Sequence, residues 1–233
     1  AYEPGNQVAV VASTLADATI AAQVAKGSVV VVVGRANLAE DDSFTMAALD
    51  AVMAAAPNAT VLPVIRRGNV RGAIETGLVT GSTTSILRSA AAGKINCLIL
   101  LGADPIADVR DTELARQAMA AVQHVIAIDT FASSSSQRAD VLLPAAAFGE
   151  KDGTTTNLEG RVTQLNRKVN VHGTARPDWM IALELADYLG HDLGVGSVQE
   201  VHQRLVSKVA AFGDATRAAL AVNPDGVLLR RSS

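Results

Sequence analysis

The sequence predicts an α/β fold, with a mostly parallel sheet that carries helices on both faces and a helical C-terminal appendage. Two apolar runs, residues 28–34 and 95–101, do not alternate with polar residues, which is typical of strands buried on both faces. Helical patterns separate such runs, and alternating strands and helices indicate βαβ units with right-handed crossovers. With 49% hydrophobic residues among 233, the chain is apolar enough for this core.

The first third of the chain is predicted to hold two helices beside its strands. The expected elements are a short strand at 8–11, a helix at 14–25, a strand at 28–34, a helix at 43–56 and a strand at 59–65. Ser13 is a suitable N-cap for the first helix, and Gly27 is a suitable stop. Pro63 predicts an edge position or a bulge for the last of these strands.

The middle of the chain is predicted to complete the sheet. Residues 66–93 are rich in Gly, Ser and Thr, and we expect a long connection with one short helix there. A further helix is expected at 112–122. The predicted parallel sheet then consists of residues 29–33, 60–65, 96–101, 124–129 and 140–143.

The sequence changes character after residue 165. We therefore predict an α/β domain at 1–165 and a mainly helical C-terminal extension at 166–233. Helices are expected at 178–189, 198–212 and 215–221. The tail after Asn223 is expected to make a turn and then to fray.

Composition excludes several classes of protein. A net charge of −3 argues against binding nucleic acid by neutralising phosphates. Cys97 is the only cysteine, so this chain can form neither a disulfide framework nor a cysteine-ligated iron–sulfur cluster. Because Cys97 lies inside an apolar run, we expect a buried small hydrophobe. No stretch of about 18 apolar residues is present, so no transmembrane helix is expected.

Residues 139–163, ADVLLPAAAFGEKDGTTTNLEGRVT, are the most distinctive stretch. Their strand is expected to end at Pro144, which lacks the N–H that a central ladder needs. We then expect a turn at Asp152–Gly153, after which the segment returns to lie against the α/β core.

The end of this stretch is expected to be structural. Asn157 and Glu159 should bond to the backbone or to Arg161, and Gly160 should allow a close approach or a positive φ. Replacing Gly160 with valine should therefore impair folding or assembly.

This stretch resembles the signature of the molybdopterin oxidoreductase superfamily. Within that superfamily, the sequence is most similar to the large iron–sulfur subunit of respiratory complex I, the NADH–quinone oxidoreductase. The other segments that carry the resemblance are VVVVVGRANLAE around residues 30–40, LPVIRRGNVRGAIETGL at 62–78 and LILLGADPIADV at 98–109.

The resemblance implies a supporting role. As a C-terminal scaffold portion of that subunit, the chain would support electron transfer from NADH to quinone without carrying redox centres or catalytic, cofactor or metal residues. Iron–sulfur clusters are then expected in an upstream part of the parent subunit. Other subunits of the peripheral arm would be its partners, on the cytoplasmic side of the inner membrane and without insertion into it.

The wider superfamily implies an alternative, a part of an oxidoreductase that binds molybdopterin guanine dinucleotide. Ligands of open α/β sheets bind at the carboxyl ends of strands, where Gly102 and Asp104 follow one strand. Asp129 and Thr130 follow another and could meet a ribose or guanine. The structural interpretation is that both aspartates cap neighbouring backbone N–H groups. A third possibility is an unrelated nucleotide-binding module.

Four further groups of residues are candidates with simpler explanations. The run Ser133–Ser136 has no glycine or lysine, so we expect a solvated loop and no phosphate site. The basic cluster consists of Arg66, Arg67 and Arg71. Its guanidinium groups could bind a phosphate or an acidic neighbour, but a place at a subunit interface or in internal ion pairs explains them equally well. The carboxylates Glu150, Asp152 and Glu159 lie within ten residues and raise the possibility of acid–base catalysis or a metal, but their spacing matches no ligand pattern, and Glu159 close to Arg161 indicates structural pairing instead. No metal-ligand spacing links the four histidines, His124, His172, His191 and His202.

Overall fold

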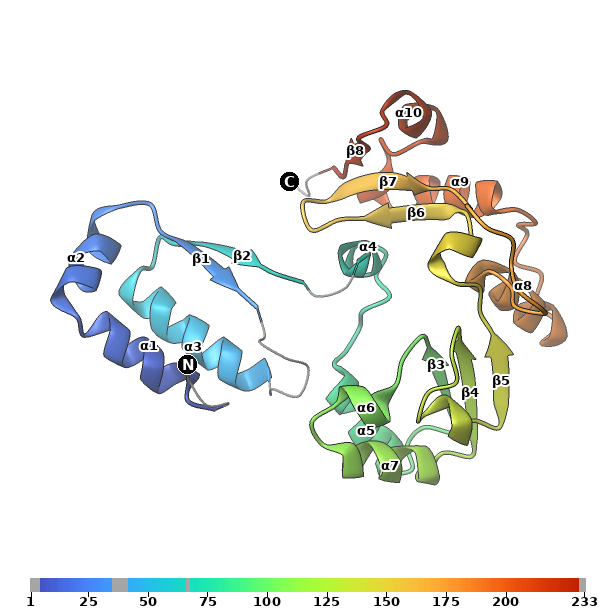
Figure 1. Ribbon diagram of the computed structural model, residues 1–233, viewed down its shortest axis with the longest axis horizontal. Coiled ribbons are helices and arrows are strands. Elements are labelled where there is room, and N and C mark those ends of the chain that lie inside the picture. Colours follow the sequence, from blue (N-terminus) through green and yellow to red (C-terminus); the bar gives the residue numbers. More distant parts are fainter. Residues whose placement is uncertain (1–4, 35–41, 66–67, 231–233) are drawn as a thin grey trace. The chain divides into compact units, whose positions relative to one another are not determined.

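The computed structural model describes residues 5–34, 42–65 and 68–230, which form two compact units (Figure 1). The first unit comprises residues 1–66 together with 108–111, and the second comprises 67–107 together with 112–233. No single helix among the described residues is long and apolar enough to cross a membrane, although α1 and α2 pass that test as a pair bent by 85°. The domain boundary at residue 165 stays a prediction.

The first unit pairs two parallel strands with three helices. Its elements are α1 (Gln7–Leu15), α2 (Ala18–Lys26), β1 (Val30–Val33), α3 (Asp42–Ala55) and β2 (Thr60–Pro63). The strand predicted at 8–11 is wrong, because these residues lie in α1, which packs against α3. Valine lowers helix propensity only slightly, so the packing of these residues against neighbouring elements determines whether they form a helix or a strand. The expected N-cap Ser13 is also wrong, since Asp17 caps α2 by accepting from the N–H of Thr19 at 2.8 Å.

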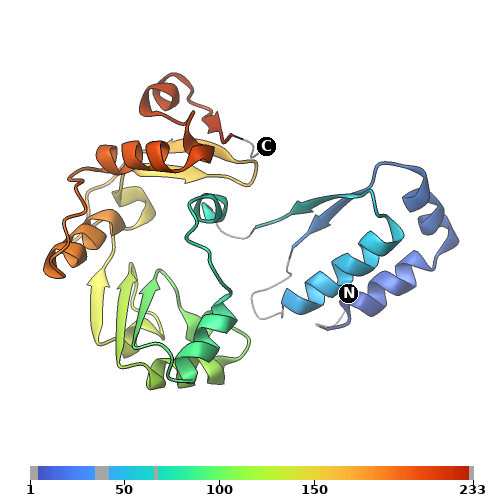
Figure 2. The same ribbon diagram turned by 180° about the vertical axis from the view of Figure 1, so that it is seen from behind.

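The lack of alternation in the valine strand predicted burial on both of its faces, and this prediction is wrong. Val30 and Val32 are 60% and 64% exposed, whereas Val31 and Val33 are half-buried. Both views show α1 and α3 on one side of the strand pair (Figure 1 and Figure 2). The described residues of this unit therefore cover one face of β1 and leave the other uncovered.

The second unit contains a three-stranded parallel sheet with β4 at its centre. Its elements are α4 (Val70–Glu75), α5 (Thr83–Ala91), β3 (Cys97–Leu101), α6 (Pro105–Asp108), α7 (Thr112–Ala121), β4 (His124–Asp129) and β5 (Val141–Pro144). Ile99, Ile126 and Val141 lie opposite one another in the register. The α/β class and the five predicted strands are confirmed, all of them in parallel pairs, but they form two sheets. The reason is that β1 and β2 belong to the other unit.

Helices pack on this sheet around two apolar clusters. Helices α5 and α7 pack against each other and bury Leu87, Ala90, Ala115, Ala118 and Met119. Helix α8 (Asp178–Tyr188) places Ile181 against Ile128 and Ala145. The expected helix at 178–189 is thus confirmed with an end one residue earlier.

The C-terminal part adds a three-stranded antiparallel sheet. Its elements are β6 (Gly153–Thr156), β7 (Arg161–Leu165), α9 (Val198–Lys208), α10 (Arg217–Val222) and β8 (Val227–Leu228). Val162 of β7 forms a core with Phe212 and Leu220. The tail does not fray at residue 223, because β8 pairs with β7 and the Arg230 N–H donates to the carbonyl of Ala211 at 2.8 Å.

The course predicted for residues 148–163 is partly wrong. The parallel strand does end at Pro144, as expected. The turn lies at residues 157–160 instead of 152–153, and the hairpin joins the antiparallel sheet instead of returning to the parallel one. Asn157 determines this position, because its Oδ1 accepts from the N–H of Arg161 at 2.9 Å while Gly160 takes a φ of +87°.

Gly160→Val should destabilise the chain by about 2 kcal/mol, because a left-handed φ costs a residue with a Cβ about 1–2 kcal/mol and β-branching restricts valine further. The cost is conformational, since an added Cβ would meet Leu229 only at 3.8 Å. Urea unfolding of the chain measures it. Gly160→Asn is the matched control, because asparagine tolerates this region and should lose clearly less. Equal losses would contradict the conformational explanation.

Candidate functional site

The loop after β3 is held by a partly buried hydrogen-bond network. Asp104 accepts from the N–H of Ser134 at 3.2 Å, and from the N–H and the hydroxyl of Ser135 at 3.1 and 2.5 Å. The Ser135 hydroxyl in turn accepts from the N–H of Ile106 at 3.0 Å. Both oxygens of Asp104 are therefore engaged in joining the loop after β3 to the loop after β4.

The Ser133–Ser136 run is not the solvated loop that its composition predicted. Ser135 is fully buried and Ser136 is 2% exposed. The Ser136 hydroxyl accepts from the N–H of Ser133 at 2.6 Å. Serine hydroxyls here accept hydrogen bonds from loop N–H groups that would otherwise be buried without partners. These bonds offset the free-energy cost of burying polar residues.

The residues that follow β3 and β4 include a carboxylate oxygen and a glycine that make few contacts with the described residues. Asp129 Oδ1 accepts from the N–H of Thr130 at 2.8 Å, while its Oδ2 has no hydrogen-bond partner among the described residues. Gly102 has a φ of +56°, and no atom lies within 4 Å of where its Cβ would be. Because β3 and β4 are parallel neighbours, Gly102, Asp104, Asp129 and Thr130 all lie at one edge of the sheet. This end of the sheet offers one carboxylate oxygen without a hydrogen-bond partner among the described residues and, at Gly102, room for an approaching group.

The other acidic candidates have structural partners. Glu150 accepts from the N–H of Ala147 at 2.8 Å, and Asp152 Oδ1 accepts from the N–H of Arg167 at 2.9 Å. The expected pairing of Glu159 with Arg161 is confirmed, with Nε and Oε2 3.0 Å apart. Hydrogen bonding from Arg161 lowers the pKa of Glu159, which keeps this carboxylate ionised and unsuited to acid–base work near neutral pH.

The basic cluster and the histidines show no ligand-binding arrangement in the part of the chain that the structure describes. Arg66 and Arg67 lie outside the described residues, and Arg71 pairs with Glu75 at 2.7 Å. His202 is buried, with Nε2 2.8 Å from the carbonyl oxygen of Ala215. Across residues 5–34, 42–65 and 68–230, no three acidic, histidine or cysteine side chains gather where they could hold a metal.

Cys97 is exposed, which corrects the expectation of burial. It begins β3, an edge strand whose Ile99 and Leu101 point to the same exposed face. Its position at the amino end of β3 places it at the opposite end of the strand from the open sheet edge.

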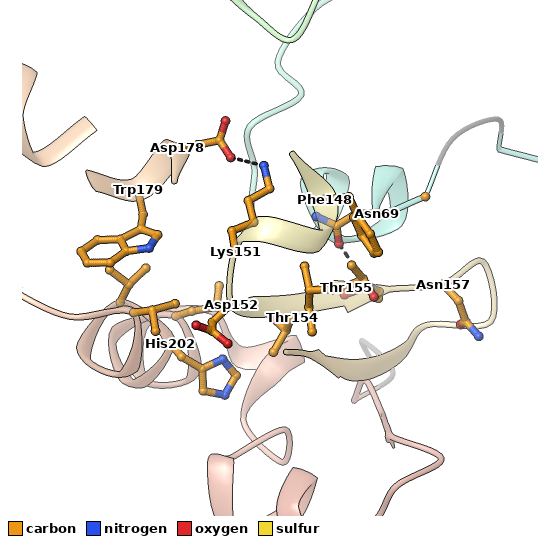
Figure 3. Close-up of a pocket in the computed structure, with 17 residues that line it drawn as sticks. Asn69, Phe148, Lys151, Asp152, Thr154, Thr155, Asn157, Asp178, Trp179 and His202 are labelled. Atoms are coloured by element: carbon orange, nitrogen blue, oxygen red, sulfur yellow. Dashed lines mark hydrogen bonds and ion pairs between the residues drawn. The ribbon is translucent and has the colours of Figure 1, made fainter. Parts of the chain in front are cut away.

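A groove of about 690 Å³ lies between β6 and helices α8 and α9 (Figure 3). Its apolar lining is Phe148, Leu165, Trp179, Val198, Val201 and Leu205. Lys151 and Asp178 form an ion pair at its side, and Asp152, directly before β6, and Thr154 of β6 also line it (Figure 3). Sequence reasoning missed this groove. A signal was present in α9, where three apolar residues recur at i, i+3 and i+7.

The groove ends at α4, which is attached to β6 by one long-range bond. Asn69 Oδ1 accepts from the buried N–H of Thr156 at 2.9 Å. This contact joins two motifs that the sequence singled out, GNVRGA and GTTTNLEGR, across 87 positions.

Comparisons with known proteins agree on one family. The sequence profile described as molybdopterin oxidoreductase matches residues 5–188. The chain is 31% identical to F420-dependent formate dehydrogenase 2 subunit alpha of Methanococcus maripaludis, over 57% of this chain and 20% of that protein. It is 28% identical to the NADPH-Fe(3+) oxidoreductase subunit alpha of Geobacter sulfurreducens, over 67% and 22%. It is 38% identical to the assimilatory nitrate reductase catalytic subunit of Bacillus subtilis, over 42% and 14%. The matches thus span about a fifth or less of these relatives.

Proposed function

The chain belongs to the molybdopterin oxidoreductase family, and we propose that it is the part of an oxidoreductase subunit that receives the nucleotide end of molybdopterin guanine dinucleotide. The carboxyl edge of β3 and β4 is the proposed place. Similarity to subunits named for formate dehydrogenase and nitrate reductase supports an oxidoreductase that acts on a small molecule together with a partner subunit.

One observation carries this proposal, the free Oδ2 of Asp129 at an open edge of the sheet. A guanine base presents two N–H donors and a ribose presents hydroxyl donors, so a carboxylate acceptor fits either. The open space over Gly102 lets a ligand approach the backbone where a Cβ would stand in the way. Thr130 is exposed beside Asp129 and adds a hydroxyl. These residues fit the nucleotide end of the cofactor.

The residues of this chain would hold and orient the cofactor. When bound, the cofactor would supply redox chemistry through its metal. Asp104 would act indirectly, because its two oxygens keep the loops after β3 and β4 together and so keep Asp129 in place. Cys97, at the amino end of β3, is not placed to ligate a metal at this edge.

Asp129→Asn in the full-length protein should lower the bound guanine nucleotide at least tenfold. The asparagine keeps Oδ1 as the acceptor for Thr130 but presents an NH₂ donor to the donors of the ligand. Acid release of GMP, quantified per protein together with molybdenum, measures the content. Asp152→Asn is the matched control and should retain the nucleotide, because Asp152 lies directly before β6, in the groove and not among the residues that follow β3 and β4.

Undiminished nucleotide in Asp129→Asn would contradict the proposed position. Wild-type protein without nucleotide or molybdenum would favour a second candidate, the scaffold portion of the large iron–sulfur subunit of complex I. The hydrogen bonds from Ser135 to Asp104 favour that candidate, because they join the loops after β3 and β4 through the protein's own side chains. Under it, the purified complex should oxidise NADH with quinone, and Asp129→Asn should leave that rate per assembled complex unchanged.

A further inference from the structure

Strand β6 has a free edge that faces the groove. The antiparallel sheet is ordered β6-β7-β8, so β7 occupies only one side of β6, and no described strand occupies the other. The N–H of Asn157 donates to the carbonyl of Arg161 at 3.0 Å, which identifies 157 and 161 as a hydrogen-bonded pair. In an antiparallel ladder such pairs alternate, so Thr155 and Gly153 face β7 while Thr154 and Thr156 direct their backbone groups outward.

The outward groups are only partly used. Asn69 takes the N–H of Thr156, which agrees with the alternation. The N–H and C=O of Thr154 have no hydrogen-bond partner within the described residues. An unpaired edge of this kind is a template for another strand unless something covers it.

The floor beside this edge is apolar. Val198 and Val201 of α9 and Trp179 of α8 are half-buried along the groove. Phe148 borders it and is 66% exposed. A strand laid along β6 would therefore place alternate side chains on an apolar surface, which is how strand addition combines backbone bonds with side-chain selectivity.

We propose that the free edge of β6 binds an extended segment of a partner subunit, a segment that is apolar at alternate positions and carries a lysine or arginine. Residues 152–155 line the groove in succession before Thr156, whose outward N–H is taken by Asn69, and they span about 13 Å at about 3.3 Å per residue. The free part of the edge thus accommodates about four residues of the segment.

The basic residue follows from the charges at the start of β6. Lys151 and Asp178 neutralise each other in an ion pair. Asp152 has one oxygen on the N–H of Arg167, and its other oxygen has no partner among the described residues. Asp152 thus presents a carboxylate oxygen without a hydrogen-bond partner among the described residues at this end of the groove, and the cationic group of an arriving side chain complements it.

The names of the relatives indicate that the extended segment comes from a partner subunit. Two of them are alpha subunits, which implies at least one other subunit in each enzyme. The inference does not depend on the proposed cofactor site, since the groove and the carboxyl edge of β3 and β4 share none of their residues.

The binding test uses the capped peptide Ac-Lys-Val-Thr-Val-Thr-Val-NH₂ and the fluorescence of Trp179, the only tryptophan of the chain and part of the groove lining. We expect a saturable change in emission. Two N-methylated versions of the peptide, blocked at alternate amides, should differ, because only one set of amides faces β6. One version should bind at least tenfold more weakly, and the other should bind like the parent. Equal binding of both, or no saturable change, would overturn the proposal.

Variants locate the interaction on β6 and α9. Thr154→Pro removes an outward N–H without touching the ladder to β7, so peptide affinity should fall at least tenfold, whereas Thr154→Ala should retain it. Val201→Lys should weaken binding similarly, and Gln203→Lys, on an exposed position of α9, should not. Unchanged Trp179 emission of the free variants shows that they are folded. If the variants fail to fold, binding of the two N-methylated peptides to the wild-type protein tests whether the peptide pairs with β6.

Photo-crosslinking identifies the source. A benzoylphenylalanine in place of Phe148, in the full-length protein within its purified complex, should cross-link to a segment of another subunit. A cross-link to the same polypeptide, or to a second copy of it, would overturn the assignment to a partner subunit.

Discussion

Gly226→Ala should lower the free energy of unfolding by about 3 kcal/mol. Gly226 has a φ of +89°, a conformation that costs a residue with a Cβ about 1–2 kcal/mol. The added Cβ would also press on the carbonyl oxygen of Val162 and lie 2.7 Å from Cγ2 of Thr163. Forced contacts of this kind typically cost about 1–3 kcal/mol. The two costs add because a shift that relieves the contact does not relieve the dihedral.

Strand β8 is the element that this substitution would displace. Gly226 lies directly before β8, and moving the chain away from Val162 breaks the β7–β8 pairing. The next contacts are the bond from the N–H of Leu229 to the carbonyl of Gly160 at 2.8 Å and the ion pair of Arg230 with Asp214. If the tail detaches as a whole, the loss is limited to the free energy with which it docks.

Urea unfolding measures the effect, with Gly93→Ala as the control. Gly93 has a φ of +70° and no atom within 4 Å of an added Cβ, so only the dihedral cost applies there. We expect Gly93→Ala to lose about 1–2 kcal/mol and Gly226→Ala clearly more. Equal losses in the two variants would show that the contact with Val162 is relieved at no cost.

Local pattern was sufficient to predict the parallel strands but not their surroundings. An unbroken apolar run and a proline stop are features of a few adjacent residues, and they located β3, β4 and β5 correctly. The same rule failed for the exposure of Val30, because burial depends on which elements cover a strand. Strand β8 was missed because its two residues carry no periodicity and exist as a strand only through pairing with β7.

The candidate site shows the same division. The position of Asp104 and Asp129 at the strand ends followed from the sequence. Which of the two keeps a free oxygen did not, because Asp104 is occupied by Ser135, 31 positions away. The groove beside β6 is assembled from α8, α9 and the hairpin, so no single window of sequence contains it.

The hydrogen bond from the Thr156 N–H to Asn69 Oδ1 attaches the start of α4 to β6. Gly72→Ala should destabilise the protein by about 1–2 kcal/mol, although alanine is normally favoured over glycine in a helix by about 1 kcal/mol. The added Cβ would lie 2.5 Å from Asn69 Oδ1, which would have to leave the N–H of Thr156. That N–H points away from β7 in a residue that is 2% exposed, so losing its acceptor costs about 1–3 kcal/mol.

The effect of Gly72→Ala on stability should change from destabilising to neutral or stabilising when Asn69 is first replaced by glycine. Asn69 has a φ of +65°, which glycine adopts without strain, so Asn69→Gly removes the side chain and leaves the backbone in place. In that background the nearest atom to the added Cβ, among those known to lie close, is Thr156 Oγ1 at 3.1 Å, so Gly72→Ala should be neutral or stabilising by up to about 1 kcal/mol. Urea unfolding of the wild type, both single variants and the double variant gives the coupling, expected to be about 2 kcal/mol. Additive losses would show that Gly72 is required for a reason other than the bond from Thr156 to Asn69.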